Sequence, residues 1–171
     1  MTWVDILVII ILFLSFFGGL KEGAVKNSFS LMILIAAIPL AGLSYRLLAV
    51  ILSFLPGTSW ENFIGFFITL GLINVLLHFL LFLPRRFIQI LWKRGTFYRL
   101  LGGALNILNA SIGMVVFTLT LGVYPIIGWL EHAIANSSVL ARLVEHLSFV
   151  QAMLPEIFQN AAVLAMTSLT M

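Results

Sequence analysis

The chain of 171 residues contains no cysteine, which excludes disulfide bonds, thiolate metal sites and cysteine nucleophiles. Charged residues are also scarce, at 9% of the chain, whereas soluble domains contain about 25%. Hydrophobic residues make up 62%, and the mean hydropathy is +1.17. A soluble fold of this size could not bury so much apolar surface. The composition therefore excludes a soluble globular enzyme, a disordered chain and a secreted disulfide scaffold, and it predicts a membrane protein.

The sequence also lacks the patterns that accompany common catalytic and metal sites. It has no H-E-x-x-H pair, no phosphate-binding glycine loop and no G-x-S-x-G turn. Asp5 is its single aspartate, and the C-terminal His132 and His146 lie far from His78 along the chain. Because no nucleophile, base and orienting acid come together, we predict a protein that is not an enzyme and that binds no cofactor and no metal.

Four apolar segments are long enough to cross a bilayer, whose hydrocarbon core takes about 20 helical residues. They cover approximately residues 4–20, 28–45, 63–83 and 101–124. The first is not predicted to be a signal peptide, because signal peptides begin with basic residues and the only charge here is Asp5. The sequence thus predicts an all-α polytopic membrane protein with four transmembrane helices.

Positive charge is distributed unevenly between the loops that join these segments. The first loop carries Lys21 and Lys26, and the third carries Arg85, Arg86, Lys93, Arg94 and Arg99. The second loop and the C-terminal region carry one arginine each, and the N-terminal tail carries none. Since cytoplasmic loops are enriched in lysine and arginine, loops one and three are predicted inside. Both termini then lie outside, in the periplasm if the membrane is a bacterial inner membrane. This flanking pattern, rather than nucleic-acid binding, accounts for the pI near 9.7.

Residues 84–99 are predicted to form an interfacial helix between the third and fourth segments. Phe87, Ile88, Leu91 and Trp92 share one face, and Arg85, Arg86, Gln89 and Lys93 lie off it. Such a helix lies in the headgroup layer and attracts anionic lipid, here at the inner face of the membrane. We favour a topology anchor over a docking site for a specific lipid or partner.

The C-terminal region is more polar and predicts an amphipathic helical hairpin. Ser137 and Ser138 are positioned to cap a helix over about 139–154, Pro155 ends it, and 156–168 predicts a second short helix. This hairpin is too polar to span a bilayer. We therefore divide the chain into a four-span membrane domain, residues 1–130, and amphipathic helices, residues 131–171, at the outer membrane surface or against a partner.

Four polar side chains within the third and fourth segments form a candidate site. Asn74 and His78 share one face of the third segment, and Asn106 and Asn109 share one face of the fourth. Because all four lie toward the inner ends, a contact between the two faces is expected. One interpretation is a polar pocket or proton relay around His78. The other, which we favour, is interhelical hydrogen bonding, because no acid lies near the centre of any span.

Two further pairs are interpreted as structural. Asp5 and Arg46 lie at the predicted outer ends of their segments, so an ion-pair clamp is expected between them. Gly19 and Gly23 form a G-x-x-x-G pattern interrupted by Lys21 and Glu22. This interruption weakens it as a dimerisation signal, and a role in the turn into the second segment is favoured.

Several short motifs resemble the CvpA family of bacterial colicin V production proteins. Trp3-Val4-Asp5 opens the first apolar run, a glycine-containing basic turn follows at 19–26, and Ser28-Phe29-Ser30-Leu31 comes next. Arg99-Leu100-Leu101-Gly102 opens the last span, and the resemblance covers about residues 3–130. It implies a multi-spanning inner-membrane protein linked to colicin V production and envelope homeostasis. The family's membrane domain also occurs fused to a periplasmic serine protease, which implies anchoring or scaffolding by analogy.

The chain departs from the family pattern at charged positions. Asn27 stands where the family usually has an acid, and Tyr98-Arg99 stands where it usually has Asp-Arg. A Gly-x-x-Arg-Gly-like stretch is replaced at 106–110. If those charges carry a shared activity, it is altered in this chain.

Two functional hypotheses follow. The first is a non-enzymatic accessory or scaffold that supports toxin production or export, or envelope function, through membrane or periplasmic protein partners. The second is a small channel or transporter subunit, as a homo-oligomer, that uses the polar face around His78.

Overall fold

The structure is a computed structural model that describes residues 2–51, 58–91, 95–124 and 126–154. Within these ranges the chain is helical and contains no strand. The helices are α1 (Trp3–Glu22), α2 (Ala24–Ile51), α3 (Thr58–Leu80), α4 (Phe82–Leu91), α5 (Thr96–Val123), α6 (Gly128–Ala135), α7 (Ser138–His146) and α8 (Ser148–Met153). The predicted second C-terminal helix, 156–168, lies outside the described residues.

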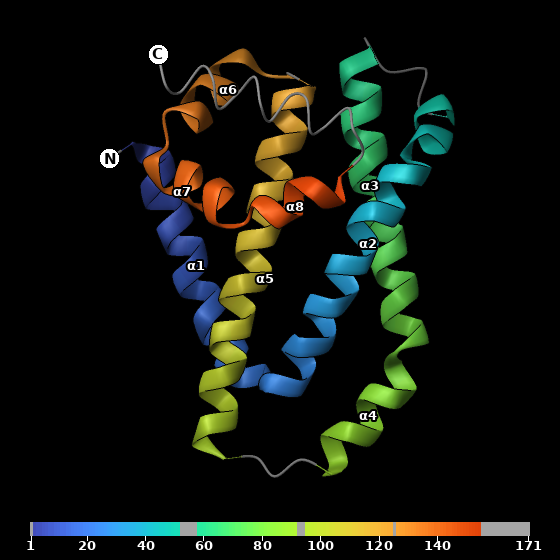
Figure 1. Cartoon of the computed structure of the whole chain (residues 1–171), viewed down its shortest axis with the longest axis vertical. Helices are drawn as coiled ribbons and strands as arrows, with labels where there is room; N and C mark the ends of the chain where they lie inside the picture. Colours follow the sequence, from blue (N-terminus) through green and yellow to red (C-terminus); the bar gives the residue numbers. More distant parts are fainter. Residues whose placement is uncertain (1, 52–57, 92–94, 125, 155–171) are drawn as a thin grey trace.

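Four of the helices are long and apolar enough to cross a membrane. They are Trp3–Glu22, Ala24–Leu48, Ser59–Leu80 and Thr96–Val123, and they contain the four segments predicted from hydropathy almost completely. The all-α fold with four transmembrane helices is therefore confirmed. We call the end of the bundle at which α1 begins and α5 ends the upper end, and the opposite end the lower end (Figure 1).

The long helices pack in two pairs, and contact between α2 and α5 joins the two pairs. α1 lies along α5, α2 lies along α3, and α2 also contacts α5. At the lower end α3 and α4 stand away from α5 in Figure 1, with the start of α2 between them. Many apolar side chains on the outward faces are exposed, Leu43 at 78% and Phe79 at 82% for example. Such faces suit a lipid environment, where burial against protein brings no hydrophobic gain.

The C-terminal helices lie across the upper half of the bundle (Figure 1). Leu147, Val150 and Leu154 pack into one core cluster with residues of α2, α3 and α5, and Leu140 packs into a second with residues of α1 and α5. The apolar side of these amphipathic helices is thus buried against the chain's own long helices. The predicted cap is confirmed, because the Ser137 hydroxyl accepts a hydrogen bond from the Leu140 amide at the start of α7.

Two helix boundaries differ from the prediction. The single helix expected over 139–154 is interrupted at Leu147, whose ψ of 34° departs from helical geometry, so that α7 and α8 are separate helices. Where the interfacial helix was expected over 84–99, the structure has α4, which ends at Leu91, and residues 96–99 belong to α5 instead. The position of α4 at the membrane interface stays a prediction. Gly95 has extended backbone angles and forms the N-cap of α5, which places the start of this span five residues before the predicted one.

Candidate functional site

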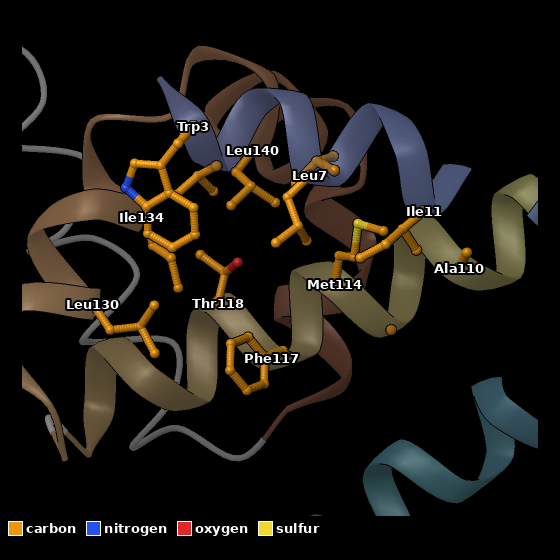
Figure 2. A pocket seen from close by; sticks show the side chains of 13 residues that line it. Trp3, Leu7, Ile11, Ala110, Met114, Phe117, Thr118, Leu130, Ile134 and Leu140 are labelled. Carbon is orange, nitrogen blue, oxygen red and sulfur yellow. The ribbon is translucent and has the colours of Figure 1, made fainter. Parts of the chain in front are cut away.

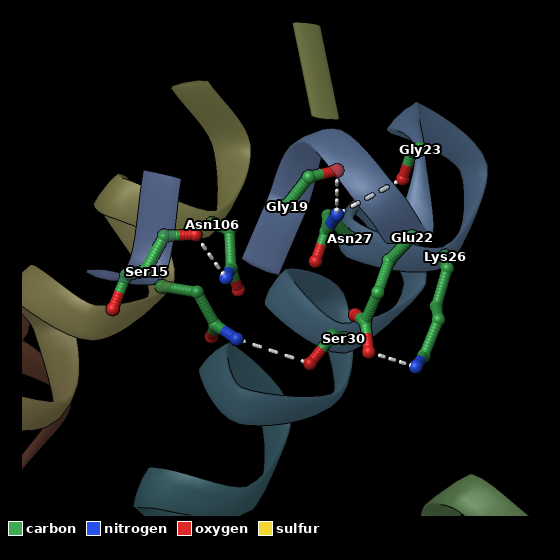
Figure 3. Close-up of polar contacts among 9 residues, drawn as sticks. Ser15, Gly19, Glu22, Gly23, Lys26, Asn27, Ser30 and Asn106 are labelled. Carbon is green, nitrogen blue, oxygen red and sulfur yellow. Dashed lines mark hydrogen bonds and ion pairs between the residues drawn. The ribbon is translucent and has the colours of Figure 1, made fainter. Parts of the chain in front are cut away.

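The turn between α1 and α2 consists of one residue, Gly23, and organises a group of polar contacts at the lower end. Its φ of 82° lies in the left-handed region that favours glycine. The side-chain amide of Asn27, which is only 1% exposed, donates to the carbonyl oxygens of Gly19 at 3.3 Å and Gly23 at 2.9 Å (Figure 3). Both carbonyls also accept a backbone amide, Gly19 from Gly23 and Gly23 from Asn27, so the Asn27 side chain adds a second hydrogen bond to each.

The first turn of α5 closes over this turn. The Val25 amide donates to the Tyr98 hydroxyl at 3.3 Å, and Arg99 Nε donates to the Leu20 carbonyl at 3.2 Å. The Tyr98 ring lies so close to Gly23 that a side chain at position 23 would collide with it. Glu22 and Lys26 form an ion pair along the exposed edge of the turn. The end of α1, the start of α2 and the start of α5 are thereby held together.

Small residues let α1 and α5 approach closely just above the turn. A Cβ atom at Gly19 would lie 2.4 Å from the Gly102 carbonyl oxygen and 2.8 Å from the Gly103 Cα atom. The glycine pair read as a weak dimerisation signal therefore serves two purposes within the chain. Gly19 packs against α5, and Gly23 makes the turn. Close approach of backbones through glycine is a common way for helices to associate in lipid.

Two asparagines of α5 continue these contacts upward. Asn106 Nδ2 donates to the Ser15 carbonyl of α1 at 2.6 Å (Figure 3). Asn109 Nδ2 donates to the Ser30 hydroxyl of α2 at 3.0 Å. Sequence reasoning identified both asparagines but not these serine partners. We call Gly19, Gly23, Asn27, Tyr98, Asn106 and Asn109 the lower joint, because these residues fasten α1, α2 and α5 to one another.

The single aspartate forms a second joint at the upper end. Asp5 is fully buried, and its Oδ1 atom accepts from the Ser137 hydroxyl at 2.6 Å and the Val139 amide at 3.1 Å. Its Oδ2 atom accepts from the Thr2 amide at 2.7 Å. The carboxylate thus lies between the N-termini of α1 and α7, where free amides and helix dipoles favour negative charge. We call Thr2, Asp5, Ser137 and Val139 the upper joint.

The expected clamp between Asp5 and Arg46 is wrong. Among the residues that the structure describes, these two form no ion pair, because Asp5 is enclosed by donors from the start of α1 and from α7. The Tyr45 hydroxyl, next to Arg46 in sequence, instead lies 3.0 Å from the Tyr124 hydroxyl beyond the end of α5. Burial, together with the hydrogen bond to Tyr45, raises the pKa of the Tyr124 phenol above its ordinary value.

The structure does not bring the predicted polar face together. His78 Nδ1 lies 3.0 Å from the Asn74 carbonyl of its own helix, while Asn106 and Asn109 bond to α1 and α2. The expected contact between the His78 region and the two asparagines is therefore absent from the described contacts. The periodicity placed each pair on one face correctly. It could not show that α5 turns this face toward α1 and α2 rather than toward α3.

The basic residues predicted at the inner side occupy several different settings. Arg86 is exposed on α4, and its guanidinium carbon lies 5.9 Å from the centre of the Phe82 ring. Arg99, expected in the interfacial helix, belongs to α5 and the lower-end contacts. The side chain of Arg85 and all of Lys93 and Arg94 lie outside the described part of the chain. Within the described part, no three His, Asp or Glu side chains are grouped so that they could hold a metal ion.

We expect Asn106→Leu to lower the free energy of unfolding by about 0.6 kcal/mol, the average worth of an interhelical hydrogen bond in a membrane protein. His78→Leu should cost less, because the described hydrogen bond of His78 is to its own helix. Thermal unfolding in detergent would compare the two variants. A larger loss for His78→Leu than for Asn106→Leu would contradict this assignment of the two residues.

Most positions at which the chain departs from the CvpA pattern meet at the lower joint. Asn27 binds the end of α1, Tyr98 packs on Gly23, and Asn106 binds Ser15. Both Asn27 Oδ1 and Asn109 Oδ1 are buried without a hydrogen-bond partner in the described structure. In this chain the joint is assembled from amides, hydroxyls and backbone groups, with the charges of Glu22, Lys26 and Arg99 at its exposed edge.

Comparison with known proteins agrees with the resemblance in the sequence. No significant match was found among curated proteins or among solved structures. The family model described as colicin V production protein matches residues 4–166, nearly the whole chain, and includes both joints except Thr2. The chain therefore belongs to the colicin V production protein (CvpA) family.

Proposed function

We propose that the protein is a non-enzymatic accessory or scaffold of the bacterial inner membrane that supports colicin V or other toxin production or export and envelope homeostasis. The observation that carries this proposal is the use of the polar side chains within the bundle. Asp5, Asn27, Asn106 and Asn109 all fasten helices of the same chain to one another. These polar side chains therefore stabilise one fixed arrangement of the helices. A fixed arrangement suits a protein that acts through partners.

The surface that we assign to a partner is the outward face of α7. Arg142, Glu145 and His146 are exposed there, whereas Leu140 and Val144 of the same helix are buried. This face lies at the upper end, which the charge distribution of the loops predicts to be periplasmic. At the opposite end, α4 with the exposed Arg86 suits contact with anionic lipid. The alternative of a channel or transporter subunit has less support, because its polar face around His78 is not assembled.

A photoreactive amino acid at Glu145 tests the scaffold proposal. The variant is expressed in a bacterium that carries the colicin V system and lacks its own family member, and colicin V secretion confirms that it works. Irradiation should then give a defined adduct with one envelope protein. The matched control is the same residue at Phe79, an apolar position on α3 that is 82% exposed. Adducts with lipid or with a second copy alone at both positions would contradict the scaffold and favour the oligomeric channel.

Cysteine labelling tests the proposed orientation. Because the chain contains no cysteine, only the introduced residue can react with the thiol reagent. Thr96, at the start of α5 and exposed, is predicted to lie on the cytoplasmic side. Thr96→Cys should therefore resist a membrane-impermeant thiol reagent in intact cells and react after lysis. His146→Cys, on the exposed side of α7, should react in spheroplasts with an intact inner membrane. The opposite labelling pattern would reverse the topology.

A further inference from the structure

An apolar groove runs along the upper half of the α1–α5 pair. It has a volume of about 390 Å³ and is lined by side chains of α1, α5, α6 and α7 (Figure 2). On α1 it extends from Trp3 to Ile11, a rise of about 12 Å at 1.5 Å per residue. On α5 it extends from Ala110 to Thr118. The groove therefore lies at the depth of a single leaflet, below the upper end of the bundle.

The groove is open toward the side of the bundle. Val4 and Val8, which are about 5% exposed or less, form its floor, while Leu7 and Ile11 on the same helix are 45% and 38% exposed. Trp3, at the upper end of the groove, is 52% exposed, and its ring lies 6.2 Å from that of Trp129. Tryptophan is enriched where the hydrocarbon meets the headgroups, so this pair marks the boundary of the leaflet into which the groove opens.

One hydroxyl interrupts the apolar lining. The Thr118 side chain points into the space between α1 and α5 in Figure 2. Its Oγ1 atom is buried and has no hydrogen-bond partner in the described residues. Thr118 lies five residues before the end of α5, about 7.5 Å below it. A buried hydroxyl without a partner is unfavourable, and a ligand with an acceptor at this depth would satisfy it once rotation of the Thr118 side chain turns the hydroxyl toward the groove.

The lining decides which occupant fits. Water needs two to four polar partners, and one hydroxyl does not supply them. A polypeptide segment would bring backbone amides and carbonyls that also require partners at this depth. A hydrocarbon chain needs only apolar contact, and it is the solvent that the open side of the groove meets. We propose that this groove binds one acyl chain of a membrane phospholipid, with the ester carbonyl accepting from Thr118 and the tail running down past Met114 to Gly113.

Photoreactive phospholipid tests this site. The full-length protein is placed in vesicles of phosphatidylethanolamine and phosphatidylglycerol that contain a small fraction of phosphatidylglycerol with a diazirine on one acyl chain. After irradiation, peptide mapping should find labelling concentrated between Leu7 and Ile11 and between Ala110 and Thr118, well above that at the lipid-exposed Phe79. Uniform labelling of all exposed apolar faces would overturn the proposal.

Two glycines of α5 provide a matched pair of variants. A Cβ atom added at Gly113, which lines the groove, meets no atom within 4 Å, and the same holds for Gly122, which does not line it. Gly113→Leu should therefore fill the groove and reduce its labelling to the level at Phe79, whereas Gly122→Leu should leave the labelling unchanged. Ala110→Leu gives a second filling variant if Gly113→Leu does not fold. Unchanged groove labelling in a folded filling variant would overturn the site.

Thr118→Val tests the proposed hydrogen bond separately, because valine keeps the shape of threonine and removes the hydroxyl. We expect labelling to fall about two- to tenfold, which is the loss of affinity that corresponds to one hydrogen bond. Unchanged labelling would contradict the proposed hydrogen bond between Thr118 and the ester carbonyl. A photoreactive free fatty acid serves as the comparison ligand. If it labels the groove and the phospholipid does not, the assignment to phospholipid is wrong.

Discussion

Asp5→Ala is expected to lower the thermal unfolding midpoint by roughly 5–10 °C, the largest effect of any single substitution at the upper joint. The substitution removes the acceptor of the Thr2 amide, the Ser137 hydroxyl and the Val139 amide at once. These donors lie where little water replaces the carboxylate, since Asp5 and Ser137 are at most 1% exposed. A buried donor without an acceptor costs more than a hydrogen bond contributes when it forms.

The loss should also appear as local opening of the C-terminal helices. Ser137 and Val139 hold the start of α7 against α1, so the connection before α7 should become sensitive to limited proteolysis in the variant. Asp5→Asn keeps the size of the side chain and changes only its hydrogen bonding. It replaces one carboxylate oxygen, an acceptor, by an NH2 group that donates and would face other donors. Glu61→Gln is the control, a partly exposed carboxyl group in the first turn of α3. Equal midpoints for Asp5→Asn and Glu61→Gln would show that the upper joint contributes little.

Gly102→Val is expected to separate α1 from α5 at the lower joint and to cost about 1–3 kcal/mol of folding free energy. A Cβ atom at this position would lie 2.6 Å from the Gly19 carbonyl oxygen and 2.8 Å from the Gly23 Cα atom. These are backbone atoms, so no side-chain rotation can relieve the overlap. The helices must move apart, which also weakens the nearby bond from Asn106 to Ser15.

Gly122→Val provides the comparison for this second prediction. It lies on the same helix and carries the same change in helix propensity, but its added Cβ atom meets no atom within 4 Å. Unfolding in detergent should therefore show a clear loss for Gly102→Val and a loss of at most about 1 kcal/mol for Gly122→Val. If both variants unfold at the same midpoint, close packing at Gly102 does not stabilise the α1–α5 pair.

Local features of the sequence were sufficient to predict the four spans and the helix start at Ser137. Hydropathy placed the four spans because an apolar run of this length is stable in the hydrocarbon core of a bilayer, independently of the other segments of the chain. The helix start at Ser137 was predicted for a similar reason, since a cap involves only residues three or four apart. The start of the last span was missed because Gly95, not charge, decides where α5 begins.

The partners of the polar groups could not be predicted in the same way. Asp5 was matched with Arg46 by charge, yet besides the nearby Thr2 its partners are Ser137 and Val139, more than 130 positions away in the chain. Asn106 and Asn109 were matched with His78 by depth, yet they bond to Ser15 and Ser30. Charge and depth leave several partners open for each group, and the sequence contains no local signal that selects one.

The sequence by itself determined the membrane environment, the four spans, the family and which residues share a helix face. Only the tertiary structure decided which faces meet, and with them the two joints and the groove between α1 and α5. The physical reason is that in lipid an apolar face is equally stable against a helix or against acyl chains. Helix neighbours are therefore selected by close contacts such as Gly19 with Gly102 and by hydrogen bonds such as Asp5 with Ser137. Those contacts exist only once the helices are assembled.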